Sequence, residues 1–195
     1  MSSKILVDEI AAKTQGADIV SPFNTGNVLE QLSMLCDGGT YTVPSGTYTA
    51  PNVTAAVTPS TSWSDMESSK ITYTPPSGAK MVVYEHIVQI GQIDTRGLGH
   101  FRFKIDGTEV TKARTHLDST PMGVFFNFRH FIPIGGTADA ATGRQATWTT
   151  GKALEMETRI YSSSYRWKYH TSNHWDGSGT DAFRIPMLQI TALGS

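Results

Sequence analysis

The chain has 195 residues, of which 38% are hydrophobic and 17% charged, and its formal net charge is -1. This length allows one well-buried core with at most a small appendage, and the near-neutral charge gives no attraction to nucleic acid or to an anionic membrane surface. The low charged fraction, with abundant Thr, Ser and Gly, favours short strands joined by polar turns over amphipathic helices.

Residues 1–23 are predicted to form an extended amino-terminal arm. Its opening run, Lys4–Ile10, carries charges where a signal peptide needs apolar residues, so we expect a protein made in the cytoplasm and not exported by a cleaved signal. A short β-type segment cannot bury its own apolar atoms, but docking on a neighbouring subunit or another protein would bury them. The side chains expected to anchor the arm are Ile5, Val7, Ile10 and Ile19.

Residues 24–39 are predicted to form a short helix or linker that can also serve in oligomerisation. Asn27, followed three residues later by Glu30, has the form of a capping box, and Gly38 with the next glycine would end the helix. A helix of about two to three turns is too short to stand alone, so it is expected to pack on the body or on copies of itself. Its apolar stripe is expected at Val28, Leu32 and Leu35.

Residues 40–195 are predicted to form a β-sandwich knob. Turn signals recur every 8–12 residues or so in the first part of this region, and apolar residues alternate with polar ones over Phe101–Ile105 and Leu154–Ile160. The run Lys80–Ile93 is apolar on both sides, which places it in the middle of a sheet or at a subunit contact. With no helical crossover between strands, the fold class is all-β with antiparallel sheets.

Metal ligands are not expected in this chain. His170 and His174 have the spacing of a helical ligand pair, but the loop residues around them favour solvent-facing histidines. Asp176 and Asp181 flank a glycine-rich stretch without the ligand spacing of a calcium loop, so a plain turn is favoured. The one cysteine, Cys36, excludes an internal disulfide and a cysteine-built zinc site.

Catalytic motifs are also missing, and we expect no enzyme activity and no cofactor. The chain contains no Gly-x-Ser-x-Gly elbow and no complete dinucleotide or phosphate loop. Glu155 and Glu157 lie two residues apart on one strand face, which fits a glycosidase pair but equally fits a solvated face. No stretch approaches the roughly 18 apolar residues of a membrane span, so no membrane insertion is expected.

Aromatic side chains gather between residues 161 and 175. Exposed Tyr and Trp give rigid contact area that serves in protein interfaces and in stacking on sugar rings. The alternative is that Trp167 and Trp175 close the ends of the sandwich instead of meeting a ligand. The candidate ligand-binding residues are Tyr165, Trp167, Tyr169 and Trp175.

A series of short motifs resembles virion structural proteins of marine tailed bacteriophages, of the cyanophage or pelagiphage type. The motifs are Lys4–Ile10, Val28–Gln31, Cys36–Gly38, Ile71–Gly78, Ile105–Val110, Ile134–Gly136, Thr142–Thr149, Trp175–Gly179 and Ile190–Leu193. The resemblance implies a fibre, head-decoration or vertex protein, commonly trimeric, with a jelly-roll-like knob and no catalytic residues. The chain has no repeats and no extended coiled coil, which favours a compact knob seated on the particle over a long fibre. It also implies localisation in a virion assembled in the host cytoplasm, in contact with major capsid, portal, tail or fibre proteins.

The predicted function is therefore structural: a phage protein anchored by its arm that projects a trimeric β-sandwich knob. The alternative is a carbohydrate-binding module that recognises a host-surface glycan through Tyr165, Trp167 and Trp175. A third hypothesis, that the protein is an enzyme of the polysaccharide depolymerase class, ranks last.

Overall fold

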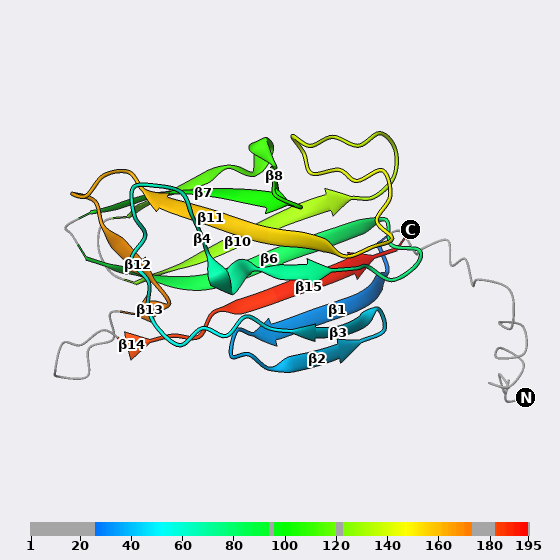
Figure 1. The fold of residues 1–195 in the computed structure, drawn as a ribbon, viewed down its shortest axis with the longest axis horizontal. Helices are drawn as coiled ribbons and strands as arrows, with labels where there is room; N and C mark the ends of the chain where they lie inside the picture. The colour runs from blue at the N-terminus through cyan, green and yellow to red at the C-terminus, as the bar shows by residue number, and fades with distance from the viewer. Residues whose placement is uncertain (1–25, 94–95, 120–122, 173–181, 195) are drawn as a thin grey trace, which may run out of the picture.

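The computed structural model describes residues 26–93, 96–119, 123–172 and 182–194 as an all-β sandwich (Figure 1). The pairings between its strands are antiparallel, so the predicted fold class is confirmed. The arm predicted over residues 1–23 lies outside the described residues and stays a prediction. Its expected anchoring side chains are Ile5, Val7, Ile10 and Ile19.

The first layer is a five-stranded sheet in the order β1-β15-β6-β10, with β12 paired to the far end of β6. The central strand is β6, as the long apolar run predicts, and it pairs with β15 on one side and β10 on the other. The bounds are β1 Val28–Leu35, β6 Met81–Gln92, β10 Val124–Pro133, β12 Trp167–Tyr169 and β15 Met187–Leu193.

The second layer is a six-stranded sheet in the order β4-β11-β7-β8, with β5 on β11 and β9 on β7. Its bounds are β4 Ser64–Asp65, β5 Ile71–Tyr73, β7 Gly97–Ile105, β8 Thr108–Glu109, β9 Thr115–Ser119 and β11 Lys152–Ile160. Two small ribbons pair β2 Thr40–Val43 with β3 Gly46–Thr49 and β13 Thr171–Ser172 with β14 Ala182–Phe183.

The helical content of the described residues is two single turns, η1 Glu67–Ser69 and η2 Thr111–Ala113. Neither turn has the length or the apolar character that a membrane-spanning helix requires.

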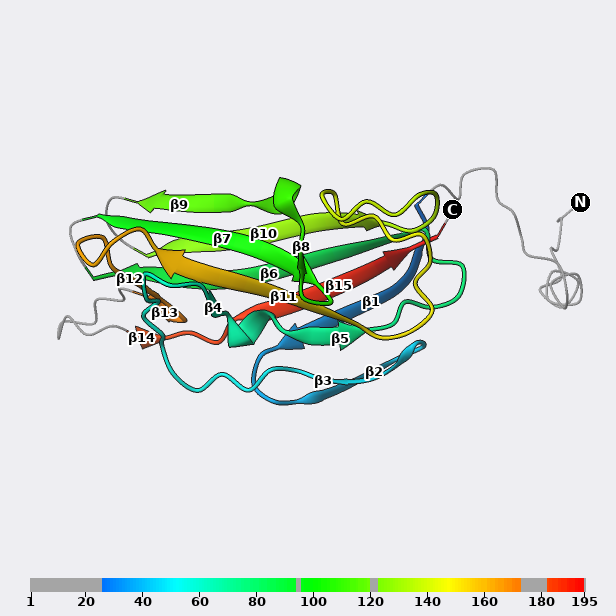
Figure 2. The ribbon, with the colours of Figure 1, turned by 45° about the horizontal axis from the view of Figure 1, so that its top comes forward.

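The core lies between the two layers, which Figure 2 shows one behind the other. Aromatic rings from both sheets meet there: Phe101 of β7 stacks on Phe126 of β10 with ring centroids 4.1 Å apart, and Tyr84 of β6 lies 4.8 Å from Phe103 of β7. Such pairs add to the free energy gained by burying their area, so they fix how the layers face each other. The outer face of each sheet is then left for function.

The helix predicted within residues 24–39 is wrong, because Val28–Leu35 forms strand β1 on the edge of the five-stranded sheet. Alternate side chains Glu30, Leu32 and Met34 point into the core. The polar Glu30 at an inward position and the apolar Leu35 at an outward one hid this alternation. Leu32 is therefore a core residue and not an anchoring one, whereas Val28 and Leu35 are exposed as an interface would need.

Candidate functional site

Charged side chains form a ladder over the outer face of the six-stranded sheet. The register sets Lys104 of β7 opposite Glu155 of β11, and Arg102 opposite Glu157. Lys104 Nζ lies 3.0 Å from Glu157 Oε1 and 3.4 Å from Glu155 Oε1, and its hydrogen bond to Glu157 is the main cause that raises the pKa of Lys104. Arg102 donates to Glu157 from its other side. The two glutamates thus serve as ion-pair partners of Lys104 and Arg102, but Glu157 is buried, so the solvated-face interpretation does not describe it.

The ladder ends at Arg159, one step further along β11. Its neighbour across the sheet is His100, not a carboxylate. The Arg159 Nε is buried without a hydrogen-bond partner in the described part of the chain, and no carboxylate there pairs with its guanidinium. Burial first, and then the nearby Arg159 charge, lower the pKa of His100, so this histidine is neutral at pH 7. Arg159 therefore carries a positive charge that the described residues leave unbalanced.

Trp63 lies over these arginines because of the β4 register. Asp65 pairs with Glu157, and Ser64 pairs with Thr158. Continuing this register by one residue puts Trp63 beside Arg159 on the outer face of the sheet. The Cζ atoms of Arg102 and Arg159 are 4.5 and 4.8 Å from the centre of the indole ring. Cation–π attraction holds the indole over the sheet at this distance. Trp63 keeps part of its surface open to solvent.

These side chains line a hollow of about 310 Å³, here named the Trp63 hollow. Glu109 contributes its one carboxylate, which accepts a hydrogen bond from Arg114 Nε at 2.5 Å and lies 3.6 Å from Arg102. Arg114 holds the pKa of Glu109 below its usual range. Because three guanidinium groups line the hollow and Glu109 is its only carboxylate, the lining is positively charged. The residues that define it are Trp63, His100, Arg102, Glu109, Arg114 and Arg159.

Two tyrosines extend the site beyond the hollow. The ring of Tyr161, which is 62% exposed, lies 6.4 Å from that of His100, and the half-buried Tyr165 lies 6.0 Å from Tyr161. Tyr165 was predicted from the sequence as a ligand-binding residue, and the structure places it one ring beyond Tyr161. The rings of Tyr161 and Tyr165 thus continue the aromatic surface beyond His100.

Trp167 and Tyr169 are not available to a ligand, and that part of the aromatic prediction is wrong. Their exposures are 1% and 3%, because β12 turns both side chains into the core. The Trp167 ring packs 5.4 Å from Phe101, in the space left by Gly99, where a Cβ would lie 2.5 Å from the indole nitrogen. The alternative interpretation, that Trp167 closes the sandwich, is the correct one. Trp175 lies outside the described residues.

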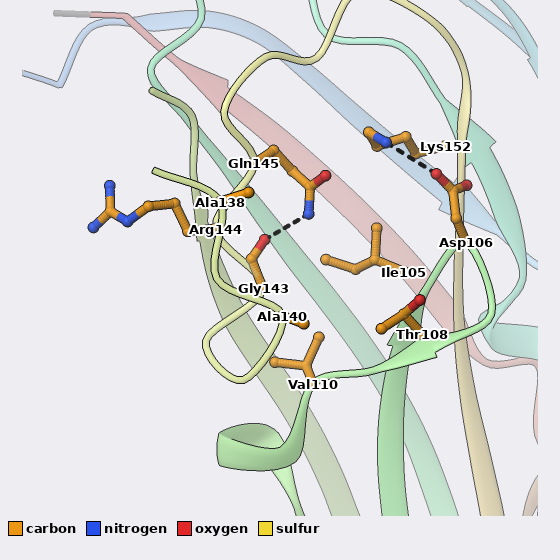
Figure 3. Close-up of a pocket in the computed structure, with 10 residues that line it drawn as sticks. All are labelled: Ile105, Asp106, Thr108, Val110, Ala138, Ala140, Gly143, Arg144, Gln145 and Lys152. Carbon is orange, nitrogen blue, oxygen red and sulfur yellow. Dashed lines mark hydrogen bonds and ion pairs between the residues drawn. The ribbon is translucent and has the colours of Figure 1, made fainter. Parts of the chain in front are cut away.

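A second hollow, of about 230 Å³, lies beside the turn between β7 and β8 (Figure 3). Its polar groups satisfy one another: Lys152 Nζ lies 3.0 Å from Asp106 Oδ2, and Gln145 donates to the Gly143 carbonyl at 2.9 Å. The Arg144 side chain points away from the centre of the hollow (Figure 3). Because Lys152 and Asp106 pair with each other and Arg144 is directed away, this hollow offers a ligand less than the Trp63 hollow does.

A buried serine between two histidines gives the appearance of a catalytic pair, but it is closed to solvent. Ser68 Oγ lies 3.0 Å from His86 Nε2 and 2.9 Å from His170 Nε2, and all three residues are at most 1% exposed. His170 is therefore not the solvent-facing loop residue that was predicted. His174, Asp176 and Asp181 lie outside the described residues, within which no cluster of His, Cys, Asp or Glu could hold a metal ion.

Comparison with known proteins gives structural likeness without a sequence relative, and the likeness is distant. No family model matches the sequence, and no curated protein matches it. Among solved structures, the chain is similar to one titled EclA C-terminal domain, a sugar-binding protein, with a TM-score of 0.33 and 16% sequence identity. The match covers 60% of this chain and 74% of that one. A likeness this distant says nothing about what this chain binds.

The Trp63 hollow could not be predicted from the sequence because its residues come from five separate segments. Alternation along β7 and β11 does predict that Arg102 and Arg159 point outward. Nothing in the sequence pairs the two-residue strand β4 with β11, and this pairing brings Trp63 to the arginines.

Proposed function

We propose that this protein is a non-catalytic β-sandwich module that binds carbohydrate in the Trp63 hollow. The observation that carries the proposal is a partly exposed indole in cation–π contact with both Arg102 and Arg159 on the outer face of the sheet. An aromatic face stacks on the C–H groups of a sugar ring, and fixed guanidinium and carboxylate groups hydrogen-bond its hydroxyls. A host-surface glycan is the partner that this role implies.

Titration calorimetry with a panel of oligosaccharides tests the proposal. Trp63→Ala is expected to weaken binding about thirtyfold, since truncating a central aromatic residue at a binding site costs about 2 kcal/mol or more. The matched control is Phe131→Ala, which removes an exposed aromatic side chain from the other sheet and should leave affinity unchanged. If the unmodified protein binds none of the saccharides, the proposal is wrong.

A second candidate function, structural assembly in a phage particle, is favoured by the outer face of the five-stranded sheet. Side chains there from β1, β10 and β15 lie on one side of the sheet by register and remain exposed to solvent. The polar outward residues Glu85, Arg129 and Gln189 separate these apolar side chains into two groups at the ends of the sheet, and copies of this chain are the proposed cover for both. This outer apolar face consists of Val28, Leu35, Phe125, Phe131 and Met187, which are 37–60% exposed.

The two roles are compatible, because the Trp63 hollow and the outer apolar face lie on opposite outer faces of the sandwich. A particle protein assembled through one face keeps the other free for a host glycan. The homotrimer, the amino-terminal anchor and the virion location belong to this second proposal.

A further inference from the structure

We infer that the saccharide taken by the Trp63 hollow is acidic, with a carboxylate or sulfate group on the ring that stacks on the indole. The inference rests on the proposed carbohydrate function and specifies its ligand. The juxtaposition that carries it is an unpaired guanidinium, Arg159, beside the partly exposed face of Trp63.

The pattern of charges singles out Arg159 among the arginines of the hollow. Arg102 is satisfied by Glu157, and Arg114 by Glu109. Arg159 faces His100 across the sheet and finds no carboxylate in the described part of the chain. A half-buried charge without a counterion is costly, so an anion that reaches it gains a charge-assisted hydrogen bond.

The surroundings of Arg159 favour an anion and disfavour a cation. Three guanidinium groups and one carboxylate line the hollow, and because Arg102 and Arg114 are each paired, the charge of Arg159 is in excess. A neutral sugar would stack on Trp63 and accept a hydrogen bond from Arg159 through a hydroxyl, but it would leave the Arg159 charge without a counterion. Only an acidic sugar both stacks on Trp63 and balances this charge.

The size of the hollow fits a small ring system. Its volume of about 310 Å³ lies at the lower end of the range of about 300–1,000 Å³ for small-molecule sites. Further rings of an oligosaccharide would extend over Tyr161 and Tyr165, whose rings continue from His100 at spacings of 6.4 and 6.0 Å. The hollow then holds the charged ring, and the tyrosines contact its neighbours.

The experiment measures the Kd for three oligosaccharides of one length: a galacturonic acid oligomer, a sulfated oligomer and a neutral galactose oligomer. At least one acidic oligomer is expected to bind about tenfold more tightly than the neutral one, and raising the salt concentration should weaken only the acidic one. The stronger of the two acidic oligomers identifies the group as carboxylate or sulfate.

The same Kd values are measured for the variant Arg159→Gln. The matched control is Arg144→Gln, which changes an arginine outside the Trp63 hollow. Arg159→Gln should remove the preference for the acidic oligomer, and Arg144→Gln should keep it. If Arg159→Gln fails to fold, the test is the salt dependence of the Kd of the unmodified protein, which should be present for the acidic oligomer and absent for the neutral one. Equal binding of neutral and acidic oligomers overturns this inference and leaves the carbohydrate function standing, whereas absence of any saccharide binding overturns both.

Discussion

At the scale of single residues, the best-defined polar group in the core is the Ser68 hydroxyl held between His86 and His170. Burial lowers the pKa of His86 to about 3, with a further contribution from the charge of His170, and lowers that of His170 to about 4. His170 also has a left-handed backbone, with φ of 64°, which an ordinary side chain adopts only when its surroundings impose it. The network therefore fixes the point where β12 passes into β13.

These histidines predict a loss of stability in mild acid. Both stay neutral in the folded protein, while in the unfolded chain they take up protons below their ordinary pKa of about 6.5. Since the unfolded state then binds more protons, the free energy of unfolding should fall as pH drops, by about 4 kcal/mol between pH 7 and pH 5. Urea denaturation at several pH values measures this slope.

His170→Asn is the variant for this test, because Asn tolerates the left-handed backbone and does not titrate. It should lose about half of the acid sensitivity, whatever its stability at pH 7. An unchanged slope would show that other groups cause the acid sensitivity.

Gly99 leaves the space that the Trp167 ring fills, so a larger residue at this position should destabilise the fold. Gly99→Ala places a Cβ into the Trp167 indole, so the free energy of unfolding should fall by about 1–3 kcal/mol. The double variant with Trp167→Phe has room for this Cβ, so adding Gly99→Ala to Trp167→Phe should cost less than adding it to the unmodified chain. Additive losses in thermal melting would mean that the two sites do not meet.

At the scale of elements, β1 depends on a buried carboxylate. Glu30 is 4% exposed and accepts hydrogen bonds from Tyr73 at 2.7 Å, from the Ser45 hydroxyl at 2.6 Å and from the Ser45 backbone N–H at 2.7 Å. It ties β1 to the β2–β3 turn and to β5. Burial, and then Glu30 itself, raise the pKa of Tyr73, so this tyrosine remains a donor.

Glu30→Ala should therefore lower the free energy of unfolding by about 3 kcal/mol, because three donors lose their acceptor. Urea denaturation checks this loss, with Glu67→Ala as an exposed control that should change stability by less than about 0.5 kcal/mol. A similar small effect of both substitutions would contradict the role given to Glu30.

Glu30 also shows which strands can be predicted from the sequence and which cannot. Strands whose inward positions are apolar, such as β7 and β11, follow directly from their alternation. In β1 the inward Glu30 and the outward Leu35 produce a helical stripe by coincidence, and only the pairing with β15 resolves it. The Trp63 hollow depends likewise on a long-range pairing that no local pattern encodes.

At the scale of the whole molecule, the outer apolar face predicts self-association. Covering it with copies of the chain removes large apolar side chains from water, at about 25 cal/mol per Å² of buried area. Phe131→Glu should shift the mass measured by light scattering from an oligomer, expected to be a trimer, to the monomer. Tyr161→Glu changes an exposed ring elsewhere and should not. A monomeric unmodified protein would contradict the assembly proposal.

An NMR titration that follows the Trp63 indole N–H tests directly whether this sandwich binds a saccharide over Trp63. The indole N–H signal can be assigned as the one missing in Trp63→Phe. With the acidic oligosaccharide, we predict a saturable shift of this signal, while the signals of the buried Trp148 and Trp167 stay in place. Saturable binding that leaves the Trp63 signal unmoved, or no binding at all, would contradict the proposed site.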